Sequence, residues 1–366
     1  MTRHAAPGHQ HRGHCIRGTF RRCLLLLGAL SALSVAVPAA EQLQIYFIDV
    51  EGGQSTLIVA PGGQSLLVDA GFRGNTFNDK ANRGRDAGRI MAAIRDAGLT
   101  RIDYLLITHF HEDHDGGVED IATQIPIDTF IDHGDVPPQA EDNVPGTLDA
   151  FRAYAAARAK ARRHIQARPG DRIPLTGVDL TIVSSGGSTI SKALTPAGGR
   201  NAVCPATPLP AQEIYENPRS TGFVMRFERF SFLDVGDLSG KPLFDLVCPS
   251  NLIGQVDVYL VAHHGGADAA EPATLSALRP RLAVLNNGAT KGGAPATFKM
   301  LHDHSGMDVW QLHWSRNAGA DNFPPAQIAN LDESTSHWIK LTANADGSFR
   351  VTNGRTASSK DFSSVR

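Results

Sequence analysis

Hydrophobic positions along the first part of the chain follow two different periods. Residues 43–50 (LQIYFIDV), 55–60 and 65–72 are rich in β-branched and aromatic residues and are separated by glycine pairs. This pattern predicts an antiparallel strand–turn–strand start. In residues 83–98, Ile90, Ala93, Ile94 and Ala97 have helical spacing before Gly98, which predicts a helix. The nearly all-apolar run 102–108 then predicts a strand buried on both faces.

Later segments alternate in the same way. Short strands are expected at 127–134, 178–185, 222–227, 230–238 and 256–266, a short helix at 116–125 and a long Ala/Arg-rich helix at 148–168. A Gly/Pro-rich stretch at about 186–218 has no periodicity and predicts a loop insertion, and residues 356–366 predict a frayed tail. Together they predict a layered α/β (α+β) domain over residues 41–355, with polar residues at strand ends, where such folds form their sites.

The N-terminus has a different composition. Residues 1–22 carry arginines and histidines without acids, and the apolar run 23–37 leads into "PAAE". This predicts a secretory signal peptide over residues 1–40, cleaved after Ala39 or Ala40, and a periplasmic or secreted protein. A retained membrane anchor is the alternative, although the run is short for a membrane span. No other segment is apolar enough to span a bilayer, so no stable span is expected after cleavage.

Charge and cysteine content refine this picture. Residues 1–40 hold five of the 35 basic residues and none of the 37 acidic ones, so the mature chain has 30 basic and 37 acidic residues, a net charge of −7. That charge disfavours a general polyanion-binding surface, and with it nucleic acid as a substrate. Cys15 and Cys23 leave with the signal, and Cys204 and Cys248 predict one disulfide in an oxidising compartment, with two free thiols as the alternative.

The candidate chemistry centres on "LLITHFHEDHDGG" (residues 105–117), which ends the apolar run with His109, His111, Asp113 and His114. Residues two apart in an extended segment point the same way, so His109 and His111 can hold one metal. Imidazole and carboxylate ligands suit zinc or another divalent first-row metal. Further candidate ligands follow later apolar strands: Asp234, Asp237, His263 and His264.

Two metal ions are expected, most simply Zn²⁺, with Mn²⁺ and Fe²⁺ as alternatives. A carboxylate between two cations can bridge them at roughly 3.5–4 Å. Such a pair can hold a hydroxide near neutral pH, because bound cations lower the pKa of water.

The H-x-H-x-D-H motif, the later G-D-L (236–238) and the H-H-G (263–265) resemble the metallo-β-lactamase superfamily. The closest likeness is to its branch related to the soluble hydrolase domain of the DNA-uptake competence protein ComEC, through residues 47–71, 216–227 and 257–266. The resemblance covers about residues 43–300 and implies an αββα sandwich of two mixed β-sheets flanked by helices, with a dinuclear site at one edge.

The resemblance also implies a role for each matching residue. It implies that His109 and His111 bind the first metal, that Asp113 and His114 bind the second, and that Asp237 bridges them. His263 matches the last ligand, His264 is the next candidate or acts on the substrate, and Asp69 orients the site from behind the ligands. Asp113, Asp237 and His264 are accordingly the candidate catalytic side chains.

One departure from the superfamily concerns a further histidine ligand. Ser184 and Ser185 stand where many members have that histidine, and His133 either fills the place or is a structural histidine. Asn287 and His313 also end strands, where a structural role is the simpler interpretation.

The expected function is an exported dinuclear hydrolase that attacks a phosphorus or carbonyl centre with a metal-bridging hydroxide. The branch resemblance favours a phosphodiester substrate, with nucleic acid among the candidates, and a small phosphodiester, a cell-envelope phosphoester or a lactone is at least as compatible with the charge. A lactonase or another carboxylic ester or amide hydrolase is the alternative, as is a non-catalytic metal-containing binding module. The sequence does not specify an oligomeric state.

Overall fold

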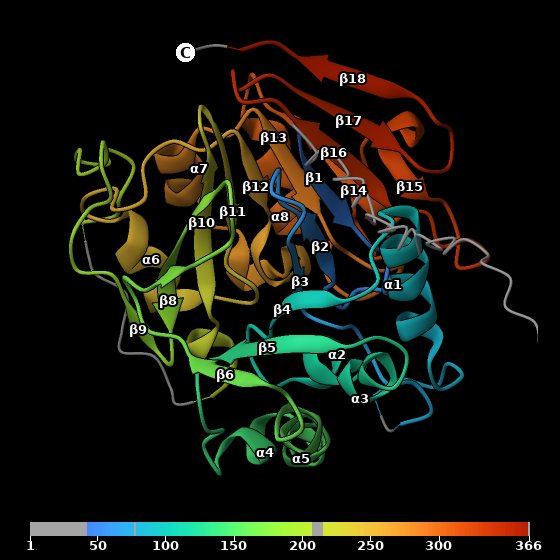
Figure 1. Ribbon diagram of the computed structural model, residues 1–366. Helices are drawn as coiled ribbons and strands as arrows, with labels where there is room; N and C mark the ends of the chain where they lie inside the picture. Colours follow the sequence, from blue (N-terminus) through green and yellow to red (C-terminus); the bar gives the residue numbers. More distant parts are fainter. Residues whose placement is uncertain (1–41, 77, 207–214, 365–366) are drawn as a thin grey trace, which may run out of the picture. The chain divides into compact units, whose positions relative to one another are not determined.

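The computed structural model describes residues 42–76, 78–206 and 215–364, and the expected signal peptide lies outside these ranges. They contain two β-sheets (Figure 1). The order of the first sheet is β18 (Ser359–Phe362), β17 (Phe349–Asn353), β16 (Ile339–Ala343), β1 (Leu43–Phe47), β2 (Thr56–Val59), β3 (Ser65–Val68), β4 (Ile102–Leu106), β5 (Ile127–Asp132) and β6 (Arg163–Gln166). It is mixed, because β1 to β3 pair antiparallel and β3 to β6 pair parallel.

The order of the second sheet is β15 (Ile328–Asn330), β14 (Asp308–His313), β13 (Leu282–Leu285), β12 (Val258–Leu260), β11 (Phe230–Asp234), β10 (Gly222–Phe227), β8 (Asp179–Ser185) and β7 (Arg172–Ile173), with β9 (Ser188–Thr189) paired to β8. Its strands β11 to β15 are parallel, and β10 pairs antiparallel with both β8 and β11. The mixed sheets expected from the sequence are therefore confirmed.

The alternation of side chains along the strands places the two sheets face to face. Leu43, Ile45 and Phe47 of β1 belong to a buried cluster that also contains Phe223 and Phe232 of the second sheet. The intervening Tyr46 instead packs outward with residues of the helices. Because successive side chains of a strand point to opposite faces, each inner strand is apolar on both sides.

Helices cover the outer face of each sheet (Figure 1). Beside the first sheet lie α1 (Arg85–Asp96), α2 (Glu112–Asp115), α3 (Val118–Ala122), α4 (Ala140–Asn143) and α5 (Thr147–Arg158). Beside the second lie α6 (Gly240–Val247), α7 (Pro272–Leu278) and α8 (Pro295–Asp303), whose buried residues form one cluster with that sheet. The layers are thus helix, sheet, sheet, helix, which is the αββα sandwich expected from the sequence.

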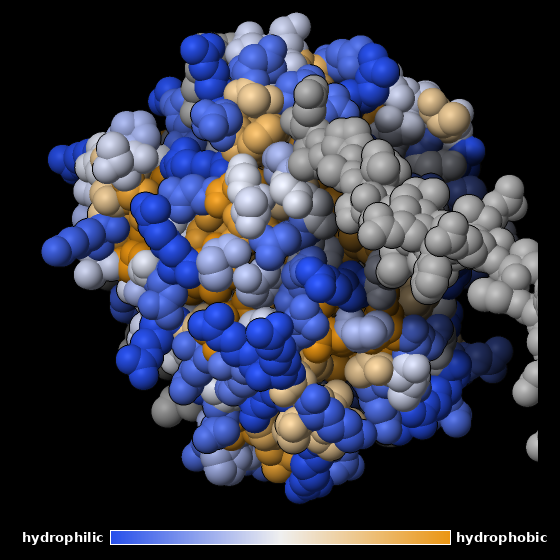
Figure 2. All heavy atoms as spheres, in the orientation of Figure 1, coloured by the Kyte–Doolittle hydropathy of each residue, from blue (hydrophilic) through white to orange (hydrophobic). Residues whose placement is uncertain are grey.

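Four short 3-10 helices complete the described elements: η1 (Asn217–Arg219), η2 (Ala262–Gly265), η3 (Ala267–Ala269) and η4 (Pro325–Gln327). On the face drawn in Figure 2, hydrophilic side chains predominate and hydrophobic ones lie mostly between them. Within the described ranges, no helix combines the length and the apolar character needed to cross a membrane.

Two segments differ from the sequence expectation. The helix expected over residues 148–168 ends at Arg158, and residues 163–166 form β6, which pairs in parallel with β5. The Ala/Arg composition favours a helix, but hydrogen bonding to the open edge of β5 outweighs that propensity. Near the C-terminus, residues 359–362 form β18 on β17 where a frayed tail was expected.

The expected disulfide between Cys204 and Cys248 is confirmed. It ties the Gly/Pro-rich segment to the end of α6, and hydrogen bonds such as Asn201 Nδ2 to the Val247 carbonyl (3.2 Å) hold the same two segments together. In the described parts of 186–218, regular structure is limited to β9 and the start of η1.

Reduction of this disulfide should destabilise the protein. The bond closes a loop of 44 residues, which chain entropy values at about 4 kcal/mol. We expect a Cys204→Ala/Cys248→Ala variant to unfold at lower denaturant concentration in a chemical-denaturation experiment. Equal midpoints for the variant and the oxidised protein would contradict a stabilising role.

Candidate metal centre

The histidine-rich motif begins at His109, three residues after β4 ends. His111 has extended backbone and precedes α2, which begins at Glu112, so Asp113 and His114 lie in its single turn. All four side chains are buried although they are polar. Burial of several polar groups beyond an apolar strand is costly unless they are paired with one another or with a ligand.

The second sheet brings three further side chains to the same place. Asp237 follows β11 after a turn at Gly236, and His263 and His264 follow β12 within η2. Gly236 has a φ of 56°, and a Cβ on it would lie 2.7 Å from Cβ of Thr108. His263 and His264 have φ values of 50° and 51°, which are rare for residues with side chains. Such strained positions are concentrated at functional sites.

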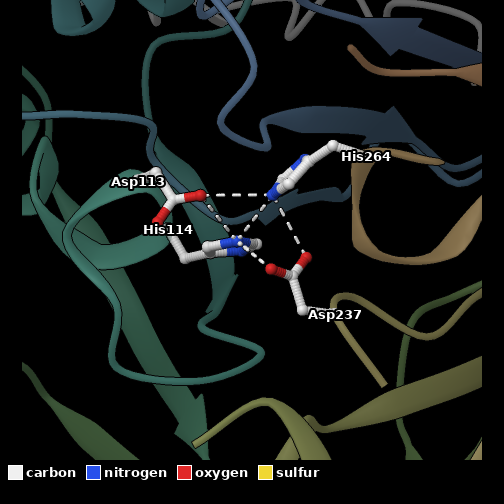
Figure 3. Close-up of side chains that lie close together, drawn as sticks. All are labelled: Asp113, His114, Asp237 and His264. Atoms are coloured by element: carbon white, nitrogen blue, oxygen red, sulfur yellow. Dashed lines mark hydrogen bonds and ion pairs between the residues drawn. The ribbon is translucent and has the colours of Figure 1, made fainter. Parts of the chain in front are cut away.

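Asp113, His114, Asp237 and His264 form one compact group (Figure 3). Nε2 of His114 lies 3.2 Å from Oδ2 of Asp113 and 3.3 Å from Oδ2 of Asp237. Nε2 of His264 lies 3.1 Å from Oδ2 of Asp113 and 3.2 Å from Oδ1 of Asp237. One ligand atom from each of the four lies within 4.8 Å of the others.

His109 and His111 lie beside this group. Nε2 of His109 is 3.8 Å from Oδ2 of Asp237 and 3.0 Å from Nδ1 of His111. Nε2 of His111 is buried and has no hydrogen-bond partner among the described residues. Asp237 therefore contacts one residue of each motif pair, His109 and His114, as a bridging carboxylate would.

Asp69, which follows β3, contacts the site from behind. Its Oδ2 lies 2.7 Å from Nδ1 of His114 and accepts a hydrogen bond from Oγ1 of Thr108 (2.8 Å), and its Oδ1 accepts from the Thr108 amide (2.7 Å). The carboxylate accepts the proton on Nδ1 of His114 and so directs Nε2 toward the centre. Metal-binding histidines are usually oriented in this way.

His133 lies apart from this group. Its Nε2 lies 2.9 Å from Oε2 of Glu216, and the same oxygen accepts a hydrogen bond from the Phe110 amide (2.9 Å). Ser184 and Ser185 instead donate hydrogen bonds to the Ser220 and Ala167 carbonyls. Within the described residues, these three side chains are engaged in protein contacts.

The two neighbouring histidines differ in their surroundings. His264 is buried, with 1% of its side chain exposed, whereas 27% of the His263 side chain is exposed. Nδ1 of His263 contacts Oδ1 of Asp268 at 2.8 Å, and its Nε2 lies 3.5 Å from Oδ2 of Asp237. His264 is therefore in the compact group, and His263 lies at its rim.

Three contributors were not singled out from the sequence. Lys291 Nζ, from the loop after β13, pairs with Oδ2 of Asp113. Glu216 supports the backbone between His109 and His111, as described above. Gln54 donates from Nε2 to both oxygens of Asp234 (3.1 Å each). Each is an ordinary polar residue in a loop or at a strand end, so composition and spacing carried no signal for it.

Charge reinforces the grouping. Burial alone raises the pKa of Asp237, but His114, His264 and His263 around it hold that pKa well below its usual value. Burial lowers the pKa of His109, and the neighbouring His114 and His111 lower it further. A carboxylate kept ionised and an imidazole kept neutral are the protonation states that bind metals.

The donor set fits divalent metal ions. Imidazole nitrogens and carboxylate oxygens converge on Asp237, the Nε2 atoms of His114 and His264 face each other at 3.2 Å, and Nε2 of His111 has no described partner. Two imidazole nitrogens can approach one another in this way when a proton or a cation lies near both.

Known proteins resemble parts of this chain. Residues 48–198 match the family model described as the metallo-beta-lactamase superfamily. A hydroxyacylglutathione hydrolase from Alkalilimnicola ehrlichii is 37% identical over 67 residues, which cover 18% of this chain and 23% of that protein. The matched stretch thus spans less than a quarter of the relative.

The solved structures that resemble this chain have lower sequence identity to it. A variant of the CmlA beta-hydroxylase has 17% sequence identity and a TM-score of 0.41, and the match covers 75% of this chain and 53% of that one. A putative metal-dependent hydrolase from Parabacteroides distasonis has 18% identity and a TM-score of 0.38, with 74% and 92% of the two chains covered.

The close approach of Gly236 to Thr108 predicts a local stability effect. Alanine at position 236 would combine an unfavourable φ with a clash against Thr108, and we expect it to lower the free energy of unfolding by about 2–4 kcal/mol. Gly170→Ala is the matched control, because Gly170 has a φ of 94° and nothing within 4 Å of an added Cβ. Its cost should be about 1 kcal/mol, and equal costs in chemical denaturation would contradict the predicted clash.

Proposed function

We propose that this chain, whose residues 48–198 match the family model of the metallo-beta-lactamase superfamily, is an exported hydrolase with two metal ions that cleaves phosphodiester or related ester bonds. The observation that carries the proposal is the position of Asp237, whose Oδ2 lies 3.8 Å from Nε2 of His109 and 3.3 Å from Nε2 of His114, and whose Oδ1 lies 3.2 Å from Nε2 of His264.

The proposed ligands follow from these contacts. His109, His111 and Asp237 would hold one ion, and Asp113, His114, Asp237 and His264 the other. When bound, such ions lower the pKa of a water molecule and stabilise negative charge that develops on the substrate. His264 takes the place for which the sequence favoured His263, because its imidazole is the buried one that contacts both aspartates. His133 is proposed as a positioning residue through Glu216.

The remaining residues orient the proposed ligands or are placed to contact the substrate. Asp69 keeps Nε2 of His114 directed at the centre, and Glu216 holds the backbone between His109 and His111 through the Phe110 amide. His263, half-buried at the rim and paired with Asp268, is placed to exchange a proton with the substrate.

Lys291 favours an anionic substrate. Its ammonium pairs with Asp113, and 40% of its side chain is exposed, so it lies between the buried group and solvent. A cation there can offset the charge of a phosphodiester as it approaches the buried carboxylates. The net charge of −7 in the mature chain supports a small phosphodiester more than long nucleic acid.

Hydrolysis of a carboxylic ester or thioester is the second candidate. It is favoured by the 67-residue match to a protein named as a hydroxyacylglutathione hydrolase. A non-catalytic binding module is less consistent with the site, because structural zinc sites generally use one closed set of four ligands.

Export is part of the proposal. The Cys204–Cys248 disulfide supports it, since disulfides persist mainly outside the cytoplasm.

Metal content should separate the roles of the two adjacent histidines. We expect His264→Ala to lose one metal equivalent per chain, measured by elemental analysis after dialysis against Zn²⁺, and His263→Ala to retain it. Asp69→Asn should keep the stoichiometry and weaken Zn²⁺ affinity about 10- to 100-fold. Loss of an equivalent in His263→Ala with retention in His264→Ala would reverse the assignment.

A substrate panel tests the reaction. Mature protein with Zn²⁺ or Mn²⁺ would be assayed with bis-p-nitrophenyl phosphate, single- and double-stranded DNA, a lactone, a thioester and a chromogenic cephalosporin. We expect turnover of the phosphodiester, and loss of at least about 100-fold in Asp237→Asn. Turnover of the thioester or lactone alone would favour the second candidate, and no turnover with metal bound would favour a binding module. His302→Ala, a substitution outside the centre, is the control.

A further inference from the structure

A second group of potential metal ligands lies outside the centre. Asp49 and Glu51 follow β1 of the first sheet, and His313 is the last residue of β14 in the second. One ligand atom from each lies within 4.8 Å of the others. Asp49 and His313 are each 1% exposed, so two of the three side chains are almost fully buried.

The imidazole of His313 is oriented for binding. Its Nδ1 lies 3.0 Å from the Trp314 carbonyl oxygen, which can only accept, so Nδ1 carries a proton. In the neutral ring, Nε2 then carries a lone pair and can act only as an acceptor. Nε2 is buried without a hydrogen-bond partner among the described residues, and lies 3.6 Å from Oε2 of Glu51.

That separation suits two ligands of one cation. Two acceptor atoms facing each other repel unless a proton or a cation lies between them. Zinc bonds of about 2.0–2.2 Å place two tetrahedral ligands roughly 3.4 Å apart. A metal-binding histidine also typically donates its other N–H to a carbonyl or carboxylate, as His313 does to Trp314.

The contacts of the two carboxylates leave Oε2 of Glu51 available. Arg89 contacts Oδ2 of Asp49 (3.2 Å) and Oε1 of Glu51 (3.0 Å), and the Glu51 amide donates to Oδ1 of Asp49 (3.1 Å). Oε2 of Glu51 remains directed at His313. Arg89 is shared by the two carboxylates, and the neighbouring Arg85 is paired with Asp79 and Asp86, so a further positive charge would be favourable.

An ion could reach this position. A cavity of about 360 Å³ is lined by Glu51, Arg85, Arg89, Thr290 and Glu333, among others. Glu51 has 14% of its side chain exposed, so it lies between this cavity and the buried His313. Water from the cavity could complete the coordination of a cation.

The group adjoins the metal centre through one loop. The Gln54 amide donates to the Asp113 carbonyl (3.1 Å), and a Cβ on Gly53 would lie 2.5 Å from the same oxygen. The segment from Asp49 to Gln54 therefore runs from one group to the other with little room to shift.

We propose that Asp49, Glu51 and His313 form a separate divalent-cation site, selective for Zn²⁺ or a similar first-row ion, that joins the two sheets beside the candidate centre. Mixed carboxylate and imidazole ligands suit such ions. The site does not depend on the proposed hydrolase activity.

Glu51→Gln tests the proposal with little disturbance, because glutamine keeps the size of the side chain and an oxygen for Arg89. In equilibrium dialysis against Zn²⁺ with elemental analysis, we expect Glu51→Gln to bind one equivalent less than the native protein, or to bind it at least 10-fold more weakly. His313→Ala should lose the same equivalent. Glu333→Gln is the matched control, since Glu333 lines the same cavity but pairs with Arg316 (2.5 Å).

Co²⁺ substitution provides a second readout. Visible absorption of the Co²⁺ protein should lose one component in Glu51→Gln and keep it in Glu333→Gln. Equal Zn²⁺ stoichiometry and affinity in both variants would overturn the proposal and leave a protonated His313 paired with Glu51. Loss of metal in His264→Ala but not in Glu51→Gln would likewise overturn it, while the assignment of the hydrolytic centre would stand.

Discussion

The contact between Asp237 and the histidines of the motif is the constraint on which the rest of the site depends. Asp237 follows a strand of the second sheet, whereas His109 and His114 follow a strand of the first, so the group exists only when the two sheets are packed together. The buried phenylalanines between the sheets, Phe223 and Phe232 among them, supply the apolar burial that keeps the layers together. Hydrophobic packing thus offsets the cost of burying several polar groups at its edge.

The backbone geometry near the site follows from the close approach of the two sheets. Gly236 passes against Thr108 with a positive φ, and Gly53 passes against the Asp113 carbonyl, where side chains would collide. His263 and His264 adopt positive φ values that direct one ring into the buried group and the other to its rim. The second group, around His313, depends on the packing of the two sheets in the same way, because its residues also come from the ends of strands in opposite sheets.

Much of the fold could be predicted because side-chain periodicity reports burial directly. The strands from Leu43 to Val68, the helix that ends at Asp96 and the buried strand β4 lie close to where the pattern placed them. The errors arose where tertiary pairing decided the outcome. Residues 163–166 became β6 because β5 offered an open edge, and residues 359–362 became β18 on β17. In neither segment do apolar and polar residues alternate regularly enough to predict a strand.

For the site, the sequence by itself determined which chemistry was available: His109, His111, Asp113 and His114 at a strand end, with Asp237 and the histidine pair farther along. Spacing restricts such residues to one loop, and strand ends gather at one edge of a sheet. The tertiary structure decided which histidine of the pair is buried against both aspartates, and that His133 contacts Glu216. It also brought His313 to Glu51, more than 250 residues away in the chain. These choices depend on the angle at which two sheets pack and on which polar atom remains without a partner, and neither is a local property of the sequence.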